Sequence, residues 1–176
     1  MVERQRRVVV GVSQSLAGLA AIRYAIRAAR ERGTPLYALR TWALPAHWRG
    51  PAVDAWQYEL SLEARRYVVG AFDAALGGPP DLDVFVAAPY GRADHVLTAT
   101  ADGEDDLLVL GGRGGFWRRP SWIVRGCIGA ARCPVIVVPP PAMASDAGPL
   151  ARRRLFRAVA RLNDVGDARH HERPRR

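Results

Sequence analysis

The sequence predicts an α/β protein built on a doubly wound, five-stranded parallel sheet with helices on both faces. Apolar runs without alternation, such as Leu107–Leu110 and Val135–Val138, are typical of strands that are buried on both faces. Between such runs lie segments whose apolar residues recur every three or four positions, which is the spacing of amphipathic helices. Because strand and helix patterns alternate along the chain, right-handed crossovers between parallel strands are expected.

The first strand and helix are predicted over residues 8–33. Val8–Val12 is almost wholly branched and apolar, as expected of a buried strand. The polar residues 13–15 can cap a helix. Helical periodicity covers residues 16–32, and Gly33 provides the stop.

The remaining elements are predicted from periodicity and from breakers such as the Gly-Gly-Pro-Pro segment at 77–80. They are a strand over 36–42, a loop over 43–52, a helix over 53–76, a strand over 82–87, a helix over 93–101 opened by Gly91, a strand over 107–110, a helix near 121–132 and a strand over 135–138.

Four glycines follow the fourth predicted strand, within residues 111–115. Glycine lets the backbone approach a ligand closely and exposes consecutive N–H groups to an anion. In doubly wound sheets, ligands bind beyond the carboxyl ends of the strands, where the strand order reverses. If the first and fourth strands are neighbours, Ser13 faces this loop, and a phosphate-bearing ligand is expected between them. A strand-to-helix turn that merely needs glycine is the alternative.

Length and composition favour one main domain over residues 1–141 of the 176. No apolar run approaches the roughly 20 residues that span a bilayer, and the N-terminus lacks the features of a signal peptide. A cytoplasmic protein without membrane contact is therefore expected.

A basic C-terminal extension is predicted over residues 142–176. All 26 basic residues of the chain are arginines, and residues 141–176 carry a net charge of +5 out of the total of +9. A short basic helix over 150–162 and a disordered end are expected. Without a recognition motif, a solvated or self-docking tail is favoured over one that binds nucleic acid.

The residue types that support catalysis are sparse, so the protein is predicted not to be an enzyme and to hold no metal. Cys127 and Cys133 fit neither a redox pair nor a zinc site and are expected to pack as small apolar residues. The acids at 104–106 are expected in a solvated turn, far from the glycine loop. His95 is expected to be structural, and a lid role for His47 has no support beyond its place in a loop.

Five segments together resemble the universal stress protein family, over about residues 7–139. They are VVGVxxS at 9–15, LRTWALP at 39–45, Gly91, DLLVLGGRG at 106–114 and CPVIVV at 133–138. The resemblance implies a Rossmann-like sheet, a homodimer formed through the last strand and, in many members, bound ATP. It implies these nucleotide-binding residues: Val12, Ser13, Thr41, Gly111, Arg113, Gly114, Gly115, Ser121 and Trp122.

Two departures from the family pattern bear on the nucleotide. Ser13 stands where nucleotide-binding members have an aspartate, and a hydroxyl lacks the charge and the second oxygen of a carboxylate. In the pattern Gly-x2-Gly-x9-Gly-(Ser/Thr), the final pair falls on Ser121 and Trp122, after a loop about three residues shorter. Arginines of this loop, Arg113 among them, could hold phosphate.

Two functions remain open on these grounds. The first is a non-catalytic stress-response regulator that binds ATP or another adenine nucleotide at a partly eroded site. The second is an interaction or scaffold dimer that has lost nucleotide binding and acts on an unknown protein partner through its surface and its arginine-rich tail.

Overall fold

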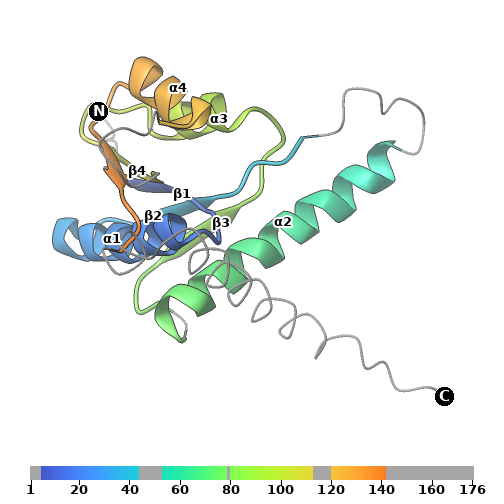
Figure 1. The fold of residues 1–176 in the computed structure, drawn as a ribbon, viewed down its shortest axis with the longest axis horizontal. Helices are drawn as coiled ribbons and strands as arrows, with labels where there is room; N and C mark the ends of the chain where they lie inside the picture. Colours follow the sequence, from blue (N-terminus) through green and yellow to red (C-terminus); the bar gives the residue numbers. More distant parts are fainter. Residues whose placement is uncertain (1–4, 44–52, 79, 113–119, 142–176) are drawn as a thin grey trace, which may run out of the picture. The chain divides into compact units, whose positions relative to one another are not determined.

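The computed structural model describes residues 5–43, 53–78, 80–112 and 120–141. The chain divides after Pro140 into two compact units, and the elements described here belong to the first (Figure 1). In order they are β1 (Val8–Gly11), α1 (Leu16–Arg32), β2 (Leu36–Leu39), α2 (Val53–Leu76), β3 (Val84–Ala87), α3 (Ala93–Thr100), β4 (Leu107–Gly111), α4 (Trp122–Ala130) and β5 (Val135–Val138).

The five strands form one parallel sheet in the order β3-β2-β1-β4-β5. The chain winds outward from β1 through β2 to β3, and then returns to the other side of β1 to add β4 and β5. The strand order therefore reverses between β1 and β4, where Val9 pairs with Leu108. This arrangement confirms the predicted fold class and the predicted neighbourhood of the first and fourth strands.

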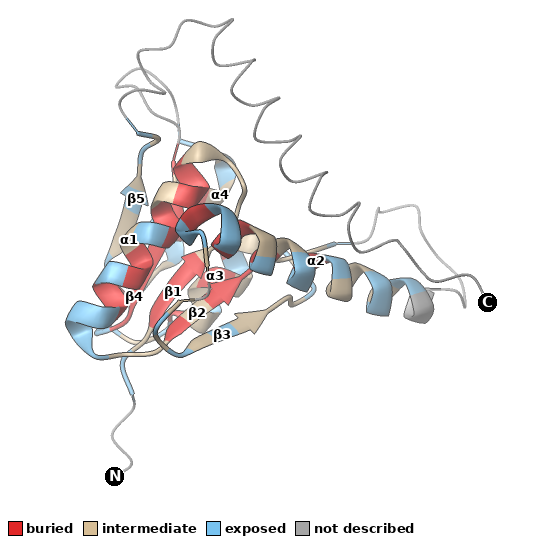
Figure 2. Cartoon of the chain, turned by 90° about the horizontal axis from the view of Figure 1, so that it is seen from below, coloured by how far each residue is buried: buried red, intermediate tan, exposed pale blue. Residues whose placement is uncertain are grey.

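Helices cover both faces of the sheet, as Figure 1 shows, with α1 and α2 on one face and α3 and α4 on the other. Each face has its own apolar core. Val8, Val10 and Val109 pack toward α1 and α2, whereas Val9, Leu108 and Leu110 pack toward α3 and α4. Figure 2 shows the buried residues concentrated in β1, β4 and α1. The strands β1 and β4 are therefore closely packed on both faces, and this packing positions the loops at their carboxyl ends.

The helices α1 and α2 have the predicted bounds, but the shorter elements differ at their ends. The second strand was expected to run to Trp42 and ends at Leu39, although Arg40 N still donates to Ala87 O at 3.1 Å. Trp42 then forms an isolated bridge with Tyr90. The other differences are small: β1 ends at Gly11, β3 begins at Val84, α3 ends at Thr100, β4 ends at Gly111 and α4 spans Trp122–Ala130. The end of β2 depends on its pairing with the segment at 87–91, which residue patterns do not show.

Asp106 corrects the prediction of a solvated acidic turn at 104–106. Its neighbours Glu104 and Asp105 are exposed, but Asp106 is only 2% exposed. Its two carboxylate oxygens accept hydrogen bonds from Arg7 N and Gly103 N, each at 3.0 Å. The carboxylate therefore ties the segment before β1 to the turn before β4.

The cysteines are buried, as predicted. Cys127 is fully buried on α4 and Cys133 is 8% exposed just before β5. Burial, with smaller contributions from the charge of Asp94 and from Cys133, raises the pKa of the Cys127 thiol to about 11. Burial also raises the pKa of Cys133. Both thiols therefore stay protonated at neutral pH and pack in the apolar core between α3, α4 and the sheet. The Cys127 thiol also donates to the carbonyl oxygen of Asp94, with 3.9 Å between sulfur and oxygen.

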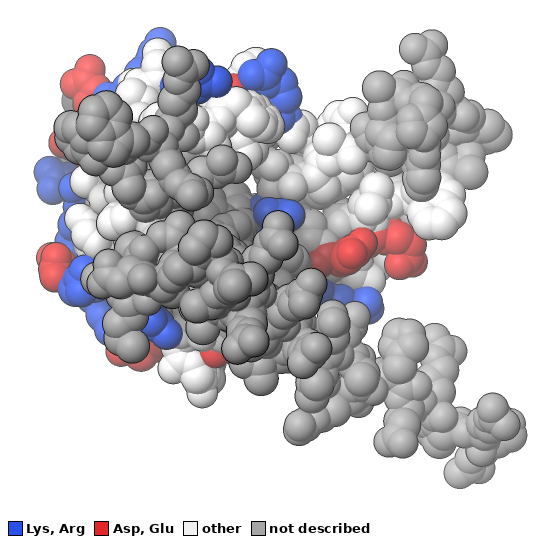
Figure 3. All heavy atoms as spheres, viewed as in Figure 1, with Lys and Arg blue, Asp and Glu red and all other residues white. Residues whose placement is uncertain are grey.

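The exposed charges of the described residues are partly paired. Arg30 contacts Asp81, and Arg6 lies 3.9 Å from Asp105, both pairs in solvent. On the face drawn in Figure 3, arginine and acidic side chains lie interspersed over the body. Across the described ranges, each helix falls short of the length or the apolarity that a membrane span needs. The predicted tail helix and the loop that carries His47 lie outside the described residues.

Candidate ligand-binding site

A cavity of about 490 Å³ lies beyond the carboxyl ends of β1, β2 and β4, at the starts of α3 and α4. Six of the nine residues predicted to bind a nucleotide line it: Val12, Ser13, Thr41, Gly111, Ser121 and Trp122. The other three, Arg113, Gly114 and Gly115, lie outside the described residues. The topology thus brings together residues from three strand ends and two helix starts, at the switch point where doubly wound sheets bind ligands.

The loop between β1 and α1 is held by its own hydroxyl groups. Ser15 is the N-cap of α1, and its Oγ accepts a hydrogen bond from Gly18 N at 3.0 Å. Ser13 Oγ lies 2.9 Å from Ser15 Oγ, within hydrogen-bonding distance. The Ser13 side chain is therefore already engaged with the helix cap.

A tyrosine from α2 fixes the same loop from the other side. Tyr67 Oη accepts a hydrogen bond from Gln14 N at 2.8 Å. The guanidinium of Arg40 lies over the Tyr67 ring, 4.3 Å from its centroid, and donates to Val12 O at 3.4 Å. Arg40 and Tyr67 therefore position the loop backbone as one unit.

Two glycines allow β4 to end directly against the first turn of α1. A Cβ on Gly111 would lie 2.7 Å from Gly18 N and 2.8 Å from the carbonyl carbon of Ala17. A Cβ on Gly18 would overlap the carbonyl oxygen of Ser13. Any larger residue at these positions would push the two backbone segments apart, so this packing requires both glycines. Gly111 also lines the cavity.

The start of α4 forms another wall of the cavity. Ser121 is the N-cap, and its Oγ accepts from Val124 N at 3.3 Å. Trp122 is the first residue of the helix and is 53% exposed. Its indole lies against the guanidinium of Arg92, 5.7 Å from ring centroid to Cζ. The indole therefore stands beside the start of α4 and next to the guanidinium of Arg92.

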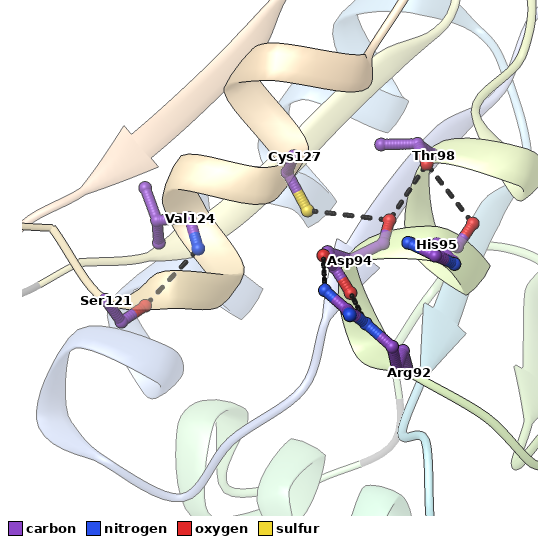
Figure 4. A network of polar contacts seen from close by, with 7 residues as sticks. All are labelled: Arg92, Asp94, His95, Thr98, Ser121, Val124 and Cys127. Atoms are coloured by element: carbon purple, nitrogen blue, oxygen red, sulfur yellow. Dashed lines mark hydrogen bonds and ion pairs between the residues drawn. The ribbon is translucent and has the colours of Figure 1, made fainter.

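Arg92 and Asp94 form a charged pair at the start of α3 (Figure 4). Gly91 precedes them with φ 132°, a conformation that favours glycine and turns the chain into the helix. Arg92 Nε donates to Asp94 Oδ1 at 3.2 Å, and Nη2 donates to Oδ2 at 2.8 Å. The Asp94 side chain is only 7% exposed, whereas that of Arg92 is 64% exposed.

The position of Asp94 depends on the contact between α3 and α4. A Cβ on Gly126 of α4 would lie 2.8 Å from Asp94 Cβ, so only glycine leaves room for the carboxylate there. The hydrogen bond from Arg92 lowers the pKa of Asp94, and the same bond raises the pKa of Arg92. Both groups are therefore charged at neutral pH, with the carboxylate buried between two helices and the guanidinium toward solvent.

The lowered pKa of Asp94 predicts how Asp94→Asn changes stability with pH. A lowered native pKa adds stability above the unfolded value of about 3.9, and this stability is lost as the pH falls through the native pKa. Asp94→Asn should therefore lower the free energy of unfolding at about pH 6 and have less effect at about pH 2.5. Urea unfolding at both pH values measures this. Asp81→Asn, which breaks an exposed pair with Arg30, should change little at either.

The described lining of the cavity carries two positive side chains, Arg40 and Arg92, and none of its residues is acidic. Sequence reasoning missed both, as well as Trp42, which also lines the cavity. Arg92 could have been predicted from the sequence, because it directly follows Gly91, which was expected to open the third helix. In the described part of the chain, no three metal-binding side chains come together. An anionic organic ligand is what this lining suits best.

Fold and cavity together define a doubly wound α/β protein with its candidate ligand site at the switch point between β1 and β4. The model of the universal stress protein family matches residues 5–139, and the chain belongs to this family.

Solved structures of the family share the fold. The chain is 24% identical to universal stress protein UspA from Lactobacillus plantarum, with a TM-score of 0.54, covering 77% of this chain and 98% of that one. A universal stress protein from Archaeoglobus fulgidus is 17% identical, with a TM-score of 0.50, covering 77% and 99%. A universal stress protein in complex with cAMP is 18% identical, with a TM-score of 0.50, covering 78% and 98%. Among curated proteins, no match to this sequence was found.

Proposed function

We propose that this chain is a non-catalytic stress-response protein that binds an adenine nucleotide in the cavity between β1, β2, β4 and the starts of α3 and α4. The observation that carries the proposal is a cavity at the switch point lined by two arginines and, among the described residues, by no acid. The family structure in complex with cAMP supports an adenine nucleotide as the ligand class.

The residue types in the cavity support binding without turnover. General acid–base catalysis needs a titratable side chain within hydrogen-bond reach of the reacting group. The described lining contains no histidine, cysteine, aspartate or glutamate. The hydroxyl residues of that lining are Ser13, Thr41 and Ser121, and the lining holds no base beside them. Ser13 Oγ is within hydrogen-bonding distance of the α1 cap residue Ser15, and Ser121 caps α4. This lining can orient a ligand and offer hydrogen bonds, but it has no group that would move a proton.

Native mass spectrometry of the full chain, with and without added Mg-ATP or AMP, tests the proposal. We expect one nucleotide per chain and no release of ADP or phosphate over hours. A protein that stays empty at millimolar nucleotide would contradict nucleotide binding and favour the interaction dimer that has lost its ligand. Steady turnover would contradict the non-catalytic part of the proposal.

A homodimer formed through β5 is the second part of the proposal, and an edge-strand variant tests it. In the described residues, β5 pairs with β4 on one side and has no strand on the other. Val137 is 38% exposed on this strand. Val137→Pro should convert the dimer to monomer, because proline removes an N–H and blocks strand addition. Phe85→Arg on β3, the opposite edge, is the control and should leave the mass unchanged in light scattering.

A further inference from the structure

We infer that Arg92 is the residue that binds the phosphate group of the ligand, and that Asp94 and Trp122 hold its guanidinium in position. The inference rests on the proposed function and names the residue that recognises the anionic end of the nucleotide. Arg92 lines the cavity, whereas Asp94 does not. Arg92 is thus the member of the pair that lines the cavity, while the carboxylate of Asp94 is buried between α3 and α4.

The hydrogen-bonding capacity of the guanidinium supports this role. Arginine has five N–H groups in a planar fork. Asp94 accepts from Nε and from one hydrogen of Nη2. Within the described part of the chain, Nη1 and the second hydrogen of Nη2 have no partner. Three donors are thus available to phosphate oxygens while the pair with Asp94 stays intact.

The surroundings of Arg92 reduce the freedom that binding would otherwise remove. An exposed arginine loses rotamer entropy when it is fixed, and this loss weakens binding. Here Asp94, buried against Gly126, holds one edge of the guanidinium. The indole of Trp122 lies against it at 5.7 Å. Trp122 begins α4, and its ring supports the cation of Arg92 there.

Arg40, the other positive residue of the lining, is committed elsewhere. Its guanidinium lies over Tyr67 on α2 and donates to Val12 O. It is therefore part of the structure of the loop. Arg92 is the more accessible of the two, since its side chain is 64% exposed.

The experiment compares AMP with adenosine, because the two ligands differ by the phosphate alone. Calorimetric titration of the full chain should show that the wild type binds AMP more tightly than adenosine. Arg92→Gln should lower the affinity for AMP by about 10- to 100-fold, the range for a lost hydrogen-bonded charge contact, and leave adenosine within about 2-fold. Asp94→Asn should lower the affinity for AMP alone, by a smaller factor. Arg125→Gln, an exposed arginine of α4 outside the lining, is the matched control and should bind like the wild type.

Each outcome bears on a different claim. If the wild type binds neither ligand at millimolar concentration, the proposed function fails, and this inference fails with it. If the wild type prefers AMP and Arg92→Gln keeps the same ratio of affinities, nucleotide binding stands and the role of Arg92 is overturned. If Arg92→Gln lowers the affinities for AMP and for adenosine by the same factor, the role of Arg92 is also overturned. An equal decrease would mean that the substitution disturbs the whole site and not a contact with the phosphate.

Discussion

Replacing Gly18 by alanine is expected to lower the free energy of unfolding by about 3 kcal/mol, at the upper end of the usual range for overpacking. The added Cβ would overlap the carbonyl oxygen of Ser13, with the carbonyl carbon also within 2.7 Å. Both are backbone atoms, so no side-chain rotation can relieve the contact. The first turn of α1 must then move away from the loop that lines the cavity. Urea unfolding measures the loss.

Gly129→Ala is the matched control for Gly18→Ala, because both glycines lie within helices. A Cβ on Gly129 meets no atom within 4 Å. Alanine has a higher helix propensity than glycine by about 1 kcal/mol, so this variant should be slightly more stable than the wild type. A Gly18→Ala protein as stable as Gly129→Ala would contradict the close approach of α1 to Ser13.

Asp106→Ala is expected to cost about 2 to 3 kcal/mol of unfolding free energy. The change leaves Arg7 N and Gly103 N without the carboxylate that accepts from them, in a place that is almost fully buried. Each unsatisfied buried donor costs about 1 to 3 kcal/mol, and water that enters the space recovers part of this. Thermal and urea unfolding of the purified variant give the value.

Asp105→Ala separates this effect from a general loss of negative charge. Asp105 precedes Asp106, is exposed, and lies 3.9 Å from Arg6 in an exposed pair. Removing it should change the unfolding free energy by less than about 1 kcal/mol. Equal losses in the two variants would mean that the buried hydrogen bonds of Asp106 contribute nothing specific.

The fold could be predicted because its determinants are local. Continuous apolar runs marked β1, β4 and β5, and 3.6-residue periodicity with a Ser15 cap and a Gly33 stop marked α1. The alternation of these elements then restricted the sheet to a few topologies. Exact strand ends were not predictable in the same way, because the end of β2 depends on its pairing with β3 and on the Trp42–Tyr90 bridge.

The candidate site was predicted in part, for a physical reason. Ser13 and the glycines after the fourth strand indicated a cavity at the switch point, and the family resemblance implied further residues there. Six of the nine residues predicted in this way line the cavity. The Arg92–Asp94 pair was not predicted, because in the sequence a buried pair of charges two residues apart looks the same as an exposed pair. Its burial depends on Gly126, which lies in another helix. Asp106 was misjudged for the same reason, since its partner Arg7 is 99 residues away.

The hydrogen bond from Gln14 N to the Tyr67 hydroxyl helps to order one wall of the cavity in the absence of a ligand. Val12, Ser13 and Gln14 are held by the Ser15 cap, by the approach of Gly18 and by the Tyr67–Arg40 pair. This wall of the cavity is therefore already ordered before a ligand binds. Binding does not incur the free-energy cost of ordering it. A ligand that binds in this cavity should therefore leave the hydrogen exchange of the Gln14 amide, which donates to Tyr67 Oη, almost unchanged.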